Sequence, residues 1–388
     1  MSPSPFAVTS STDPASYEWE ATDDGVAERF GIPVSEVLRF DLNTSPAPPR
    51  LVGELLATGR YETALSEYPP GDYRRLVEAA AATYGVSTDE VVSGAGADEI
   101  LDMCTKAFLR AGEGAVILVP TYPMYRVLAE QRGGHVVAVP RLGPDRGWAM
   151  DAPAVRAAAR TAPLVWICNP NNPTGQLEPD GVIEGLLEAI EADAETDGRP
   201  APAVVVDEAY AEFTDRSVIP LRNRFPNIVV VRTASKAYAL AGLRVGFAIA
   251  TPQTLRRVAL YRPPGSISTV SATAVTAAFH DPSDMRANVD RVARERPRLA
   301  AALEAAGWRP QPSVTNFIPL DLVTAGRSAA ASLALMRRGL VLRTFGHGHP
   351  LAHYLRVTVR DPGENDRLIA AVNEISPTLP PIPEDSPA

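Results

Sequence analysis

Apolar runs alternate with helical patterns along most of the chain. The runs GAVILVP, HVVAVP, PLVWICNP, PAVVVDEAY, NIVVVRT and VGFAIA are separated by segments such as DEILDMCTKAFLRAG and GVIEGLLEAIEADAE. Strands that are this continuously apolar, with helices between them, are typical of a mostly parallel sheet that helices cover on both faces. The pattern therefore predicts an α/β domain over residues 41–262.

The pattern changes near Pro263. A long helix rich in Arg and Ala follows, and then come the shorter apolar runs NFIPLDL, GLVLRTF and YLRVTV. We therefore expect a second, smaller α/β domain over residues 263–375. Residues 1–40 form an N-terminal arm in this interpretation, and its first 20 or so residues, rich in Ser, Pro, Thr and Asp, are expected to be flexible. Residues 376–388 are predicted to be a disordered tail.

Composition narrows the possible partners and the compartment. The formal charge of -9 and the pI near 5.2 argue against a general nucleic-acid or anionic-membrane binder, since neither is attracted to an acidic surface. Cys104 and Cys168 lie in apolar segments and cannot make a disulfide framework. The N-terminus has no secretion-signal pattern, and no apolar run approaches membrane-spanning length. We expect a cytoplasmic protein with neither nucleic-acid nor membrane partners.

Distinctive residues follow five of the apolar runs. A Gly turn, GAGADE, follows VVS; TYPMY follows ILVP; NPNNPTG follows PLVWIC; DEAY follows AVVV; and ASK follows IVVVRT. Ligands bind at the carboxyl ends of the strands in open α/β sheets. The sequence therefore predicts one ligand site built from these five strand ends.

Lys236 and Asp207 are the charged residues that stand out at this predicted edge. Lys236 could be an ordinary surface lysine, but it lies in a short segment of small residues between two apolar runs, where an ammonium is costly. A lysine driven toward the neutral amine is a nucleophile suited to Schiff-base chemistry. Asp207 could belong to a solvated acidic run or to a metal site; because it directly follows VVV, we expect a buried carboxylate with a cationic partner.

A glycine-rich turn, a histidine loop and a pair of arginines are further candidate binding sites. GAGADE suggests a dinucleotide fingerprint, but Glu99 stands where a third glycine would fall, whereas a phosphate could still bind the backbone of a helix N-terminus there. His347, His349 and His353 have the irregular spacing of a loop, so no metal site is predicted. Arg343 and Arg356 lie on neighbouring apolar runs and form a candidate anion site, because the Arg fork matches carboxylate and phosphate.

Together these motifs resemble the aminotransferase class I and II family, the fold-type I pyridoxal-phosphate enzymes, with histidinol-phosphate aminotransferases as the nearest likeness. The resemblance runs from about Asp41 to Asp366 and includes GADE, PTYPMY, NPNNPTGQ, DEAYAEF, SKAYALAGLRVGF and LRVTV in order. It implies a large domain with a mostly parallel seven-stranded sheet between helices, and a smaller α/β C-terminal domain. It also implies ping-pong amino transfer between histidinol phosphate and 2-oxoglutarate.

The resemblance assigns roles around the cofactor, pyridoxal 5'-phosphate. Lys236 would form the Schiff base and move the proton, while Asp207 would pair with the pyridine nitrogen and make the ring an electron sink. Asn172 and Tyr210 would bind the phenolic oxygen, and Tyr122 would stack on the ring. The cofactor phosphate would be bound by Ala97, Asp98, Thr233, Ser235 and Arg244.

The resemblance also implies substrate and subunit contacts. Arg356 would bind the α-carboxylate of glutamate or 2-oxoglutarate, Arg343 the substrate phosphate, and Asn172 would also lie against the substrate. Tyr68 resembles a tyrosine that reaches the cofactor phosphate of the neighbouring subunit, which implies a homodimer with shared active sites. The small-molecule partners would be an amino donor and a keto acid.

Three features depart from the family pattern. Ser45 stands where a second Asn is common, Arg360 stands where a small residue is usual, and the three-histidine loop lies between the two substrate arginines. These departures leave open an aminotransferase for aromatic or other amino acids. They also leave open a decarboxylase or lyase of specialised biosynthesis, such as a threonine-phosphate decarboxylase. A non-catalytic or nicotinamide-binding protein on this fold is the third alternative.

Overall fold

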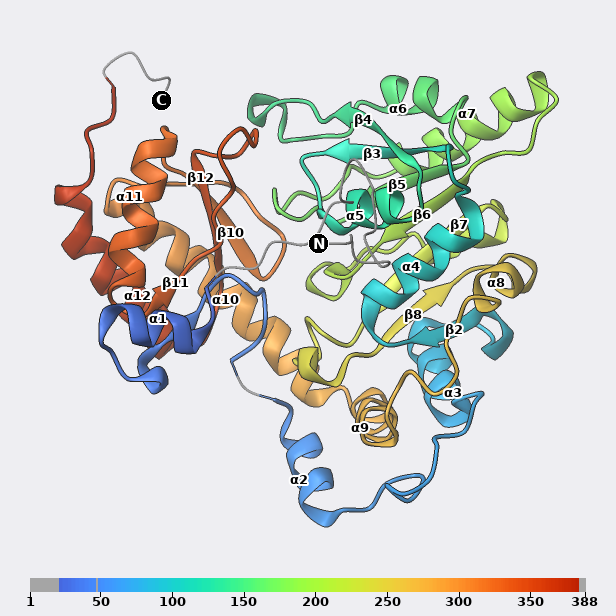
Figure 1. Ribbon diagram of the computed structural model, residues 1–388, viewed down its shortest axis with the longest axis horizontal. Coiled ribbons are helices and arrows are strands. Elements are labelled where there is room, and N and C mark those ends of the chain that lie inside the picture. Colours follow the sequence, from blue (N-terminus) through green and yellow to red (C-terminus); the bar gives the residue numbers. More distant parts are fainter. Residues whose placement is uncertain (1–20, 47, 384–388) are drawn as a thin grey trace, which may run out of the picture.

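The larger of two domains is built on a seven-stranded sheet (Figure 1). The computed structural model describes residues 21–46 and 48–383. In spatial order the strands are β2 (Val91–Gly94), β8 (Gly246–Ile249), β7 (Ile228–Thr233), β6 (Ala203–Asp207), β5 (Leu164–Cys168), β3 (Gly114–Val119) and β4 (His135–Pro140).

Most strands of the large sheet run parallel to their neighbours. β3, β4, β5, β6 and β7 pair in parallel, and β8 runs antiparallel to both β7 and β2. Every residue of the central strands β5, β6 and β7 is buried, which is what continuous runs of Val, Ile and Leu produce in a sheet covered on both faces. The predicted mostly parallel seven-stranded sheet is confirmed.

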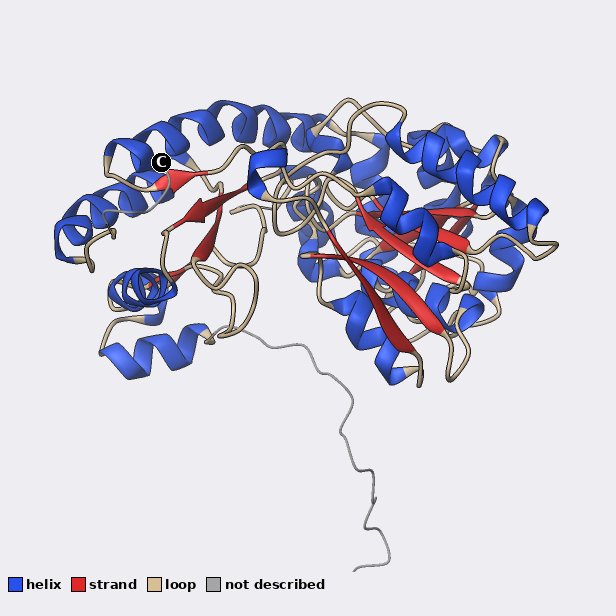
Figure 2. Ribbon diagram, turned by 90° about the horizontal axis from the view of Figure 1, so that it is seen from above, coloured by secondary structure: helices blue, strands red, loops and turns tan. Residues whose placement is uncertain are grey.

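Helices cover the two faces of this sheet as separate layers (Figure 2). One layer consists of α4 (Gly96–Phe108), α5 (Met124–Gln131) and α8 (Pro252–Ala259). The opposite layer consists of α3 (Arg74–Tyr84), α6 (Ala152–Ala159), α7 (Val182–Thr196) and α9 (Thr269–His280), and α2 (Arg50–Thr58) packs on α9.

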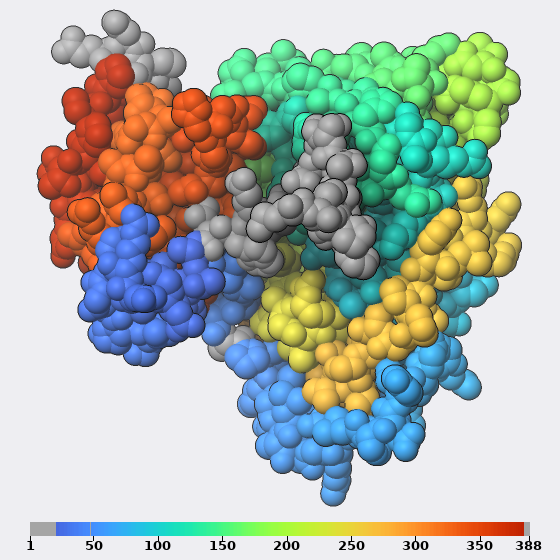
Figure 3. Space-filling model, in the orientation of Figure 1, coloured from blue at the N-terminus to red at the C-terminus, as the bar shows by residue number. Residues whose placement is uncertain are grey.

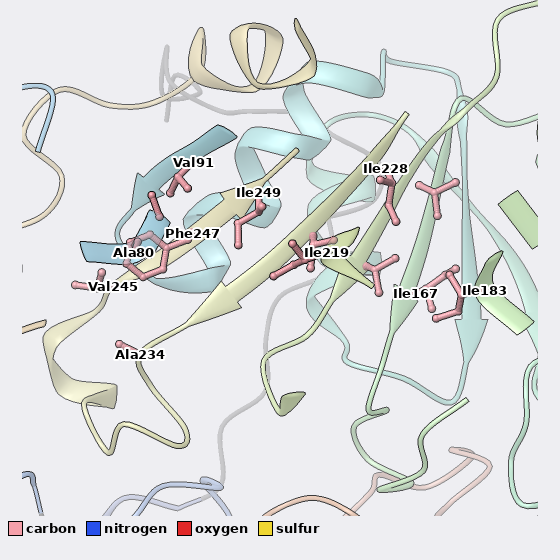
Figure 4. Packing of buried hydrophobic residues seen from close by; sticks show 14 of the residues in the cluster. Ala80, Val91, Ile167, Ile183, Ile219, Ile228, Ala234, Val245, Phe247 and Ile249 are labelled. Carbon is pink, nitrogen blue, oxygen red and sulfur yellow. The ribbon is translucent and has the colours of Figure 1, made fainter. Parts of the chain in front are cut away.

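Alternate residues of each strand serve the two layers. In β6, Val204 and Val206 belong to the core cluster on the α3, α6, α7 and α9 side, whereas Val205 belongs to the cluster under α4, α5 and α8. Figure 4 shows part of the first cluster, with Ile183 of α7 beside Ile167 of β5. This alternation decides which residue at each strand end faces the α4 and α5 layer.

The smaller domain is an α/β unit with its own core. Its antiparallel sheet has the order β12 (Tyr354–Thr358), β10 (Phe317–Asp321) and β9 (Arg309–Pro310), and β1 (Leu38–Arg39) pairs in parallel with β11 (Leu340–Val341). Its helices are α1 (Asp23–Phe30), α10 (Ser283–Ala305), α11 (Ala325–Met336) and α12 (Pro362–Ile375).

Helix α10 connects the two domains (Figures 1 and 2). Near its start, Asn288 donates a hydrogen bond to the Ala237 carbonyl of the large domain at 2.7 Å. Toward its end, Leu299 and Leu303 are buried in the core of the small domain. The short 3-10 helices are Val34–Glu36, Thr88–Glu90, Pro144–Arg146, Ala211–Phe213, Ile219–Asn223, Ala241–Leu243 and Ser376–Thr378.

The packing differs from the domain ranges expected from the sequence. Helix α9 lies in the large-domain core although it follows Pro263, because its Ala and Val face packs on α3 and α2. The segment with α1 and β1 joins the small domain through β11, so it is not a separate arm. Leu379 is buried and Arg327 donates to the Pro380 carbonyl, so the tail is attached to the small domain at these two residues, while most of its other described residues are exposed. Residues 1–20 and 384–388 lie outside the described residues.

Candidate active site

Three strands of the large sheet end side by side at one edge. Asp207 is the last residue of β6, Cys168 of β5 and Thr233 of β7, and Asp207 is in register with both Cys168 and Val231. Because side chains alternate along a strand, Asp207 lies on the same face as Val205, toward the α4 and α5 layer. The edge therefore presents a carboxylate, a thiol and a hydroxyl to one region.

The Asp207 carboxylate is only 4% exposed. Its Oδ2 atom accepts a hydrogen bond from the Tyr125 hydroxyl at 2.8 Å, and Oδ1 accepts one from the Ala209 N–H at 3.0 Å. Burial raises the pKa of Asp207 to about 6, against these two hydrogen bonds, which favour the ionised form. A cation brought to this carboxylate would be held strongly.

Lys236 lies in the turn that follows β7. Its Nζ atom donates to the Leu42 carbonyl at 3.3 Å and lies 5.7 Å from the centroid of the Tyr210 ring. Burial of the amine lowers the pKa of Lys236 to about 8, and the positive charge of Arg356 acts in the same direction. Near neutral pH a useful fraction of this amine is neutral and nucleophilic.

An anion-binding cradle lies between β7, β8 and the start of α4. The Thr233 and Ser235 hydroxyl oxygens are 2.9 Å apart, and the Ser235 N–H donates to Thr233 Oγ1 at 3.1 Å. Arg244 adds a guanidinium that pairs with Asp98 at 3.0 Å. The N-cap residue of α4, Ala95, makes no side-chain capping hydrogen bond, so the N–H groups of the first turn, which includes Ala97 and Asp98, can donate to an anion.

Two glycines make this close approach possible. A Cβ atom on Gly96, whose φ is +84°, would lie 2.5 Å from Arg244 Nη2. A Cβ atom on Gly246 would lie 2.5 Å from the Gly96 carbonyl carbon. The contact at Gly246 is with backbone, so no side chain fits there, and Gly96 has the positive φ that favours glycine and lies directly under the Arg244 guanidinium.

Tyr210 and Arg356 lie near Lys236, and Arg356 contacts Asn172. Arg356 Nη1 donates to Asn172 Oδ1 at 2.6 Å, and its Nη2 atom donates to the Asp41 carbonyl. The Tyr210 hydroxyl accepts a hydrogen bond from Asn43 Nδ2 at 2.9 Å, and burial raises the Tyr210 pKa. Arg356 comes from the small domain and Asn172 from the large one, so the domains meet at this point.

Tyr122 lies near the cradle, whereas Tyr68 does not. The Tyr122 hydroxyl donates to Asp98 Oδ1 at 3.0 Å. Tyr68 is 91% exposed, on the loop before α3. The single chain thus brings together the predicted cofactor residues other than Tyr68.

Arg343 lies opposite Arg356 across a short antiparallel bridge. The two residues exchange both backbone hydrogen bonds, at 3.0 and 3.1 Å, so their side chains leave the same face. The histidine loop is next to them: the His349 ring stacks on Phe345, with centroids 5.2 Å apart, and burial together with the charge of Arg343 lowers the His349 pKa. In the described part of the chain, no group of three or more His, Cys, Asp or Glu side chains has the arrangement of a metal site.

Arg360, a departure from the family pattern, points away from this region. Its guanidinium pairs with Glu364 at 2.8 Å and donates to the Arg39 carbonyl at 3.0 Å. It therefore ties the N-terminal segment to the small domain.

Two residues of this site were missed from the sequence. Asn43 is buried, has a φ of +54°, and receives a hydrogen bond at its carbonyl from Asn316 at 3.0 Å while contacting Tyr210. Asn is the residue type that most readily adopts this left-handed conformation after Gly, so the Asn in DLNTSP was an available signal. Tyr125 stands inside PTYPMY, but its contact with Asp207, 82 residues away in the chain, has no local signature.

Comparisons with known proteins agree with this geometry. The aminotransferase class I and II family model matches residues 54–372. The chain belongs to this family. It is 35% identical over 345 residues to a histidinol-phosphate aminotransferase of Symbiobacterium thermophilum, covering 87% of this chain and 90% of that protein. It is 33% identical over 362 residues to one of Roseiflexus castenholzii, covering 90% and 93%.

A solved structure gives the same result in three dimensions. The histidinol-phosphate aminotransferase of Sinorhizobium meliloti, in complex with pyridoxal-5'-phosphate, superimposes with a TM-score of 0.82 at 26% identity, over 93% of this chain and 96% of that one. The predicted fold-type I architecture and the predicted class, a pyridoxal-phosphate-dependent aminotransferase, are confirmed. Along residues 21–46 and 48–383, none of the helices has the length and apolarity that crossing a membrane requires.

The lowered pKa of Lys236 predicts how the apoprotein takes up its cofactor. The rate of pyridoxal-phosphate uptake, followed by stopped-flow absorbance, should rise with pH and level off above about pH 8, because the neutral amine attacks. Arg356→Met should move the midpoint of this rise to higher pH, since it removes a positive charge that favours the neutral amine. The exposed Arg337→Met serves as the control and should leave the midpoint unchanged. A rate that keeps rising to about pH 10.5, the ordinary lysine value, would contradict the account.

Proposed function

We propose that this protein transfers an amino group between histidinol phosphate and 2-oxoglutarate, with Lys236 as the residue that binds pyridoxal phosphate covalently. The observation that carries the proposal is the buried Asp207 and the partly buried Lys236 at one sheet edge, which Arg356 reaches from the small domain through its hydrogen bond to Asn172. Relatives with at least 30% identity over most of the chain carry the name of this activity, which supports the choice of substrate.

The residues present fit the cofactor. Asp207 is a buried anion suited to a protonated pyridine nitrogen, and Tyr210 and Asn172 offer hydrogen-bonding groups for the ring oxygen. When bound, pyridoxal phosphate withdraws electrons from the α-carbon of an attached amino compound. In this proposal Tyr122 would lie against the ring, and Ala97, Asp98, Thr233, Ser235 and Arg244 would bind the phosphate.

Lys236 moves the proton in this proposal. Because the pKa of its amine is lowered, Lys236 would take a proton from the substrate α-carbon and donate it to the C4′ carbon of the cofactor. The Leu42 carbonyl, 3.3 Å away, accepts a hydrogen bond from this amine and holds it over the site. Removing Lys236 removes both covalent attachment and proton transfer.

In this proposal each of the two arginines binds the anionic group of a different substrate. Glutamate carries an α-carboxylate, which Arg356 can bind in place of its contacts with Asn172 and the Asp41 carbonyl. Histidinol phosphate carries no carboxylate, and its phosphate is assigned to Arg343 on the same face. One cationic strand pair thus serves both half-reactions.

A second chain is part of the proposal. Tyr68, Leu65 and Leu260 are large exposed apolar side chains, and Tyr68 lies near Gly265. Figures 1 and 3 show the light-blue segment with α2 and the following loop projecting from the lower edge of the large domain. Covering this surface with a second copy would bury these side chains and bring Tyr68 to the neighbouring cofactor site. The cytoplasmic location expected from composition stays a prediction.

The half-reaction tests the proposed function. Pyridoxal phosphate is loaded, L-histidinol phosphate is added without a keto acid, and the visible spectrum is followed. Wild-type protein should lose its yellow colour and regain it with 2-oxoglutarate, whereas Lys236→Ala should react at least about 100-fold more slowly while keeping its fold by circular dichroism. An unchanged wild-type spectrum would reject this substrate; aromatic and other amino acids would then be tried, and release of carbon dioxide would indicate a decarboxylase.

Arg343 should discriminate between the two substrates. Arg343→Ala should raise the apparent dissociation constant of histidinol phosphate by about 10- to 100-fold, because a charge-assisted contact is lost, and that of glutamate by no more than about twofold. Both constants come from the dependence of the half-reaction rate on substrate concentration. The exposed Arg338→Ala is the matched control. Equal weakening of both substrates would show that Arg343 is not a phosphate-specific contact.

Shared active sites can be tested by mixing two defective variants. Lys236→Ala and Tyr68→Ala should each have low activity, whereas the two unfolded and refolded together should recover about a quarter of wild-type sites, because each mixed dimer contains one intact site. No recovery, or a monomer by sedimentation, would reject the homodimer with shared sites.

A further inference from the structure

We infer that Tyr125 is a positioning residue that orients the Asp207 carboxylate and holds it in its ionised form for the pyridine nitrogen of the cofactor. The inference rests on the role proposed for Asp207 and adds a residue to which neither the sequence motifs nor the comparisons assign a function. It stands on three features: the hydrogen bond itself, the fixed ring of Tyr125 and the charges around Asp207.

The hydrogen bond fixes the orientation of the carboxylate. The Tyr125 hydroxyl donates to Oδ2 at 2.8 Å, and the Ala209 N–H donates to Oδ1 at 3.0 Å. The two donors come from α5 and from the backbone after β6, so the carboxylate is held from both ends. Each oxygen accepts about two hydrogen bonds, which leaves capacity on Asp207 for a further donor such as a protonated pyridine nitrogen.

The Tyr125 ring is itself held in place. It stacks on the indole of Trp166, a residue of β5 that is 1% exposed, with centroids 5.1 Å apart and an angle of 5° between the planes. Tyr122 packs edge-on against it at 5.8 Å. Tyr125 is fully buried, so its hydroxyl cannot swing away from Asp207 toward solvent.

The neighbouring groups leave Tyr125 as the side chain that donates to this carboxylate. The titratable groups around Asp207 are Asp98 of α4, Cys168 of β5, Tyr210, Lys236 and Tyr125. Burial raises the pKa of the Cys168 thiol to about 12 and raises that of Tyr125, so both stay protonated near neutral pH. Asp98 favours protonation of Asp207, and the Lys236 charge and the two hydrogen bonds oppose it.

Loss of the hydroxyl should therefore change how cofactor affinity depends on pH. In wild-type apoprotein, affinity should fall as the pH drops through about 6, where Asp207 takes up a proton and no longer attracts a pyridinium. In Tyr125→Phe the carboxylate has one donor fewer, its pKa is higher, and the fall should begin at a higher pH. At pH 7 the dissociation constant of pyridoxal phosphate should rise by about 10- to 100-fold, as for the loss of a hydrogen bond to a charged group.

The experiment measures equilibrium binding of pyridoxal phosphate to apoprotein between pH 5 and pH 9 for the wild type and three variants. The titration of the cofactor itself is common to all four proteins and cancels in the comparison. Tyr84→Phe is the matched control, a tyrosine on the opposite face of the sheet that packs on Phe247 and Phe279; it should keep the wild-type midpoint. Asp207→Asn should bind weakly at every pH.

The outcomes distinguish the role of Tyr125 from the role proposed for Asp207. If Asp207→Asn binds weakly but Tyr125→Phe keeps the wild-type affinity and midpoint, the inference about Tyr125 is wrong and the proposed function stands. If Asp207→Asn binds like the wild type, the role of Asp207 itself is wrong. Should Tyr125→Phe not fold, 3,5-difluorotyrosine at position 125 provides a stronger donor in the same ring and should move the midpoint to lower pH; an unmoved midpoint would overturn the inference.

Discussion

A carboxylate buried at the end of a central strand is the constraint on which the rest of the site depends. Asp207 is the last residue of a strand in which every residue is buried, and an isolated carboxylate in such a place would take up a proton rather than stay ionised. Hydrogen bonds from the Tyr125 hydroxyl and the Ala209 N–H, together with the charge of Lys236, stabilise the ionised form of Asp207. The resulting carboxylate can hold a cation, which is the role that we propose for it with the pyridine nitrogen of the cofactor.

The second requirement is that two domains meet over this carboxylate. Arg356 from the small domain binds Asn172 from the large one, and residues 41–43 run between them, with the Leu42 carbonyl on Lys236 and Asn43 on Tyr210. Arg360 fixes the preceding residues to the small domain. A substrate that binds Arg356, as we propose for glutamate, would replace its contacts with Asn172 and the Asp41 carbonyl. Substrate binding would then alter the contacts between the two domains.

The mostly parallel sheet could be predicted from the apolar runs, and the shared edge of a parallel sheet predicted one ligand site at the strand ends. Lys236 and Asp207 stood out at that edge from their positions in the sequence, whereas the contacts assigned to Thr233, Ser235 and the other cofactor residues came from the family resemblance. The contacts that Asn43 and Tyr125 make could not be predicted, since their partners are 167 and 82 residues away and no periodicity in the sequence indicates such contacts. The predicted domain boundary near Pro263 was misplaced for a similar reason. In the sequence α9 looks like the start of the second domain, and only its packing on α3 shows that it belongs to the first.

The most direct test of the central claim uses the fact that the chain contains two lysines, Lys106 and Lys236. Lys106 is partly exposed and pairs with Asp102 at 2.6 Å, so it serves as an internal control for non-specific labelling. Protein loaded with pyridoxal phosphate is reduced with borohydride, digested and analysed by mass spectrometry. The account predicts the pyridoxyl group on the Lys236 peptide and unmodified Lys106; a label on Lys106, or no label on Lys236, would contradict it.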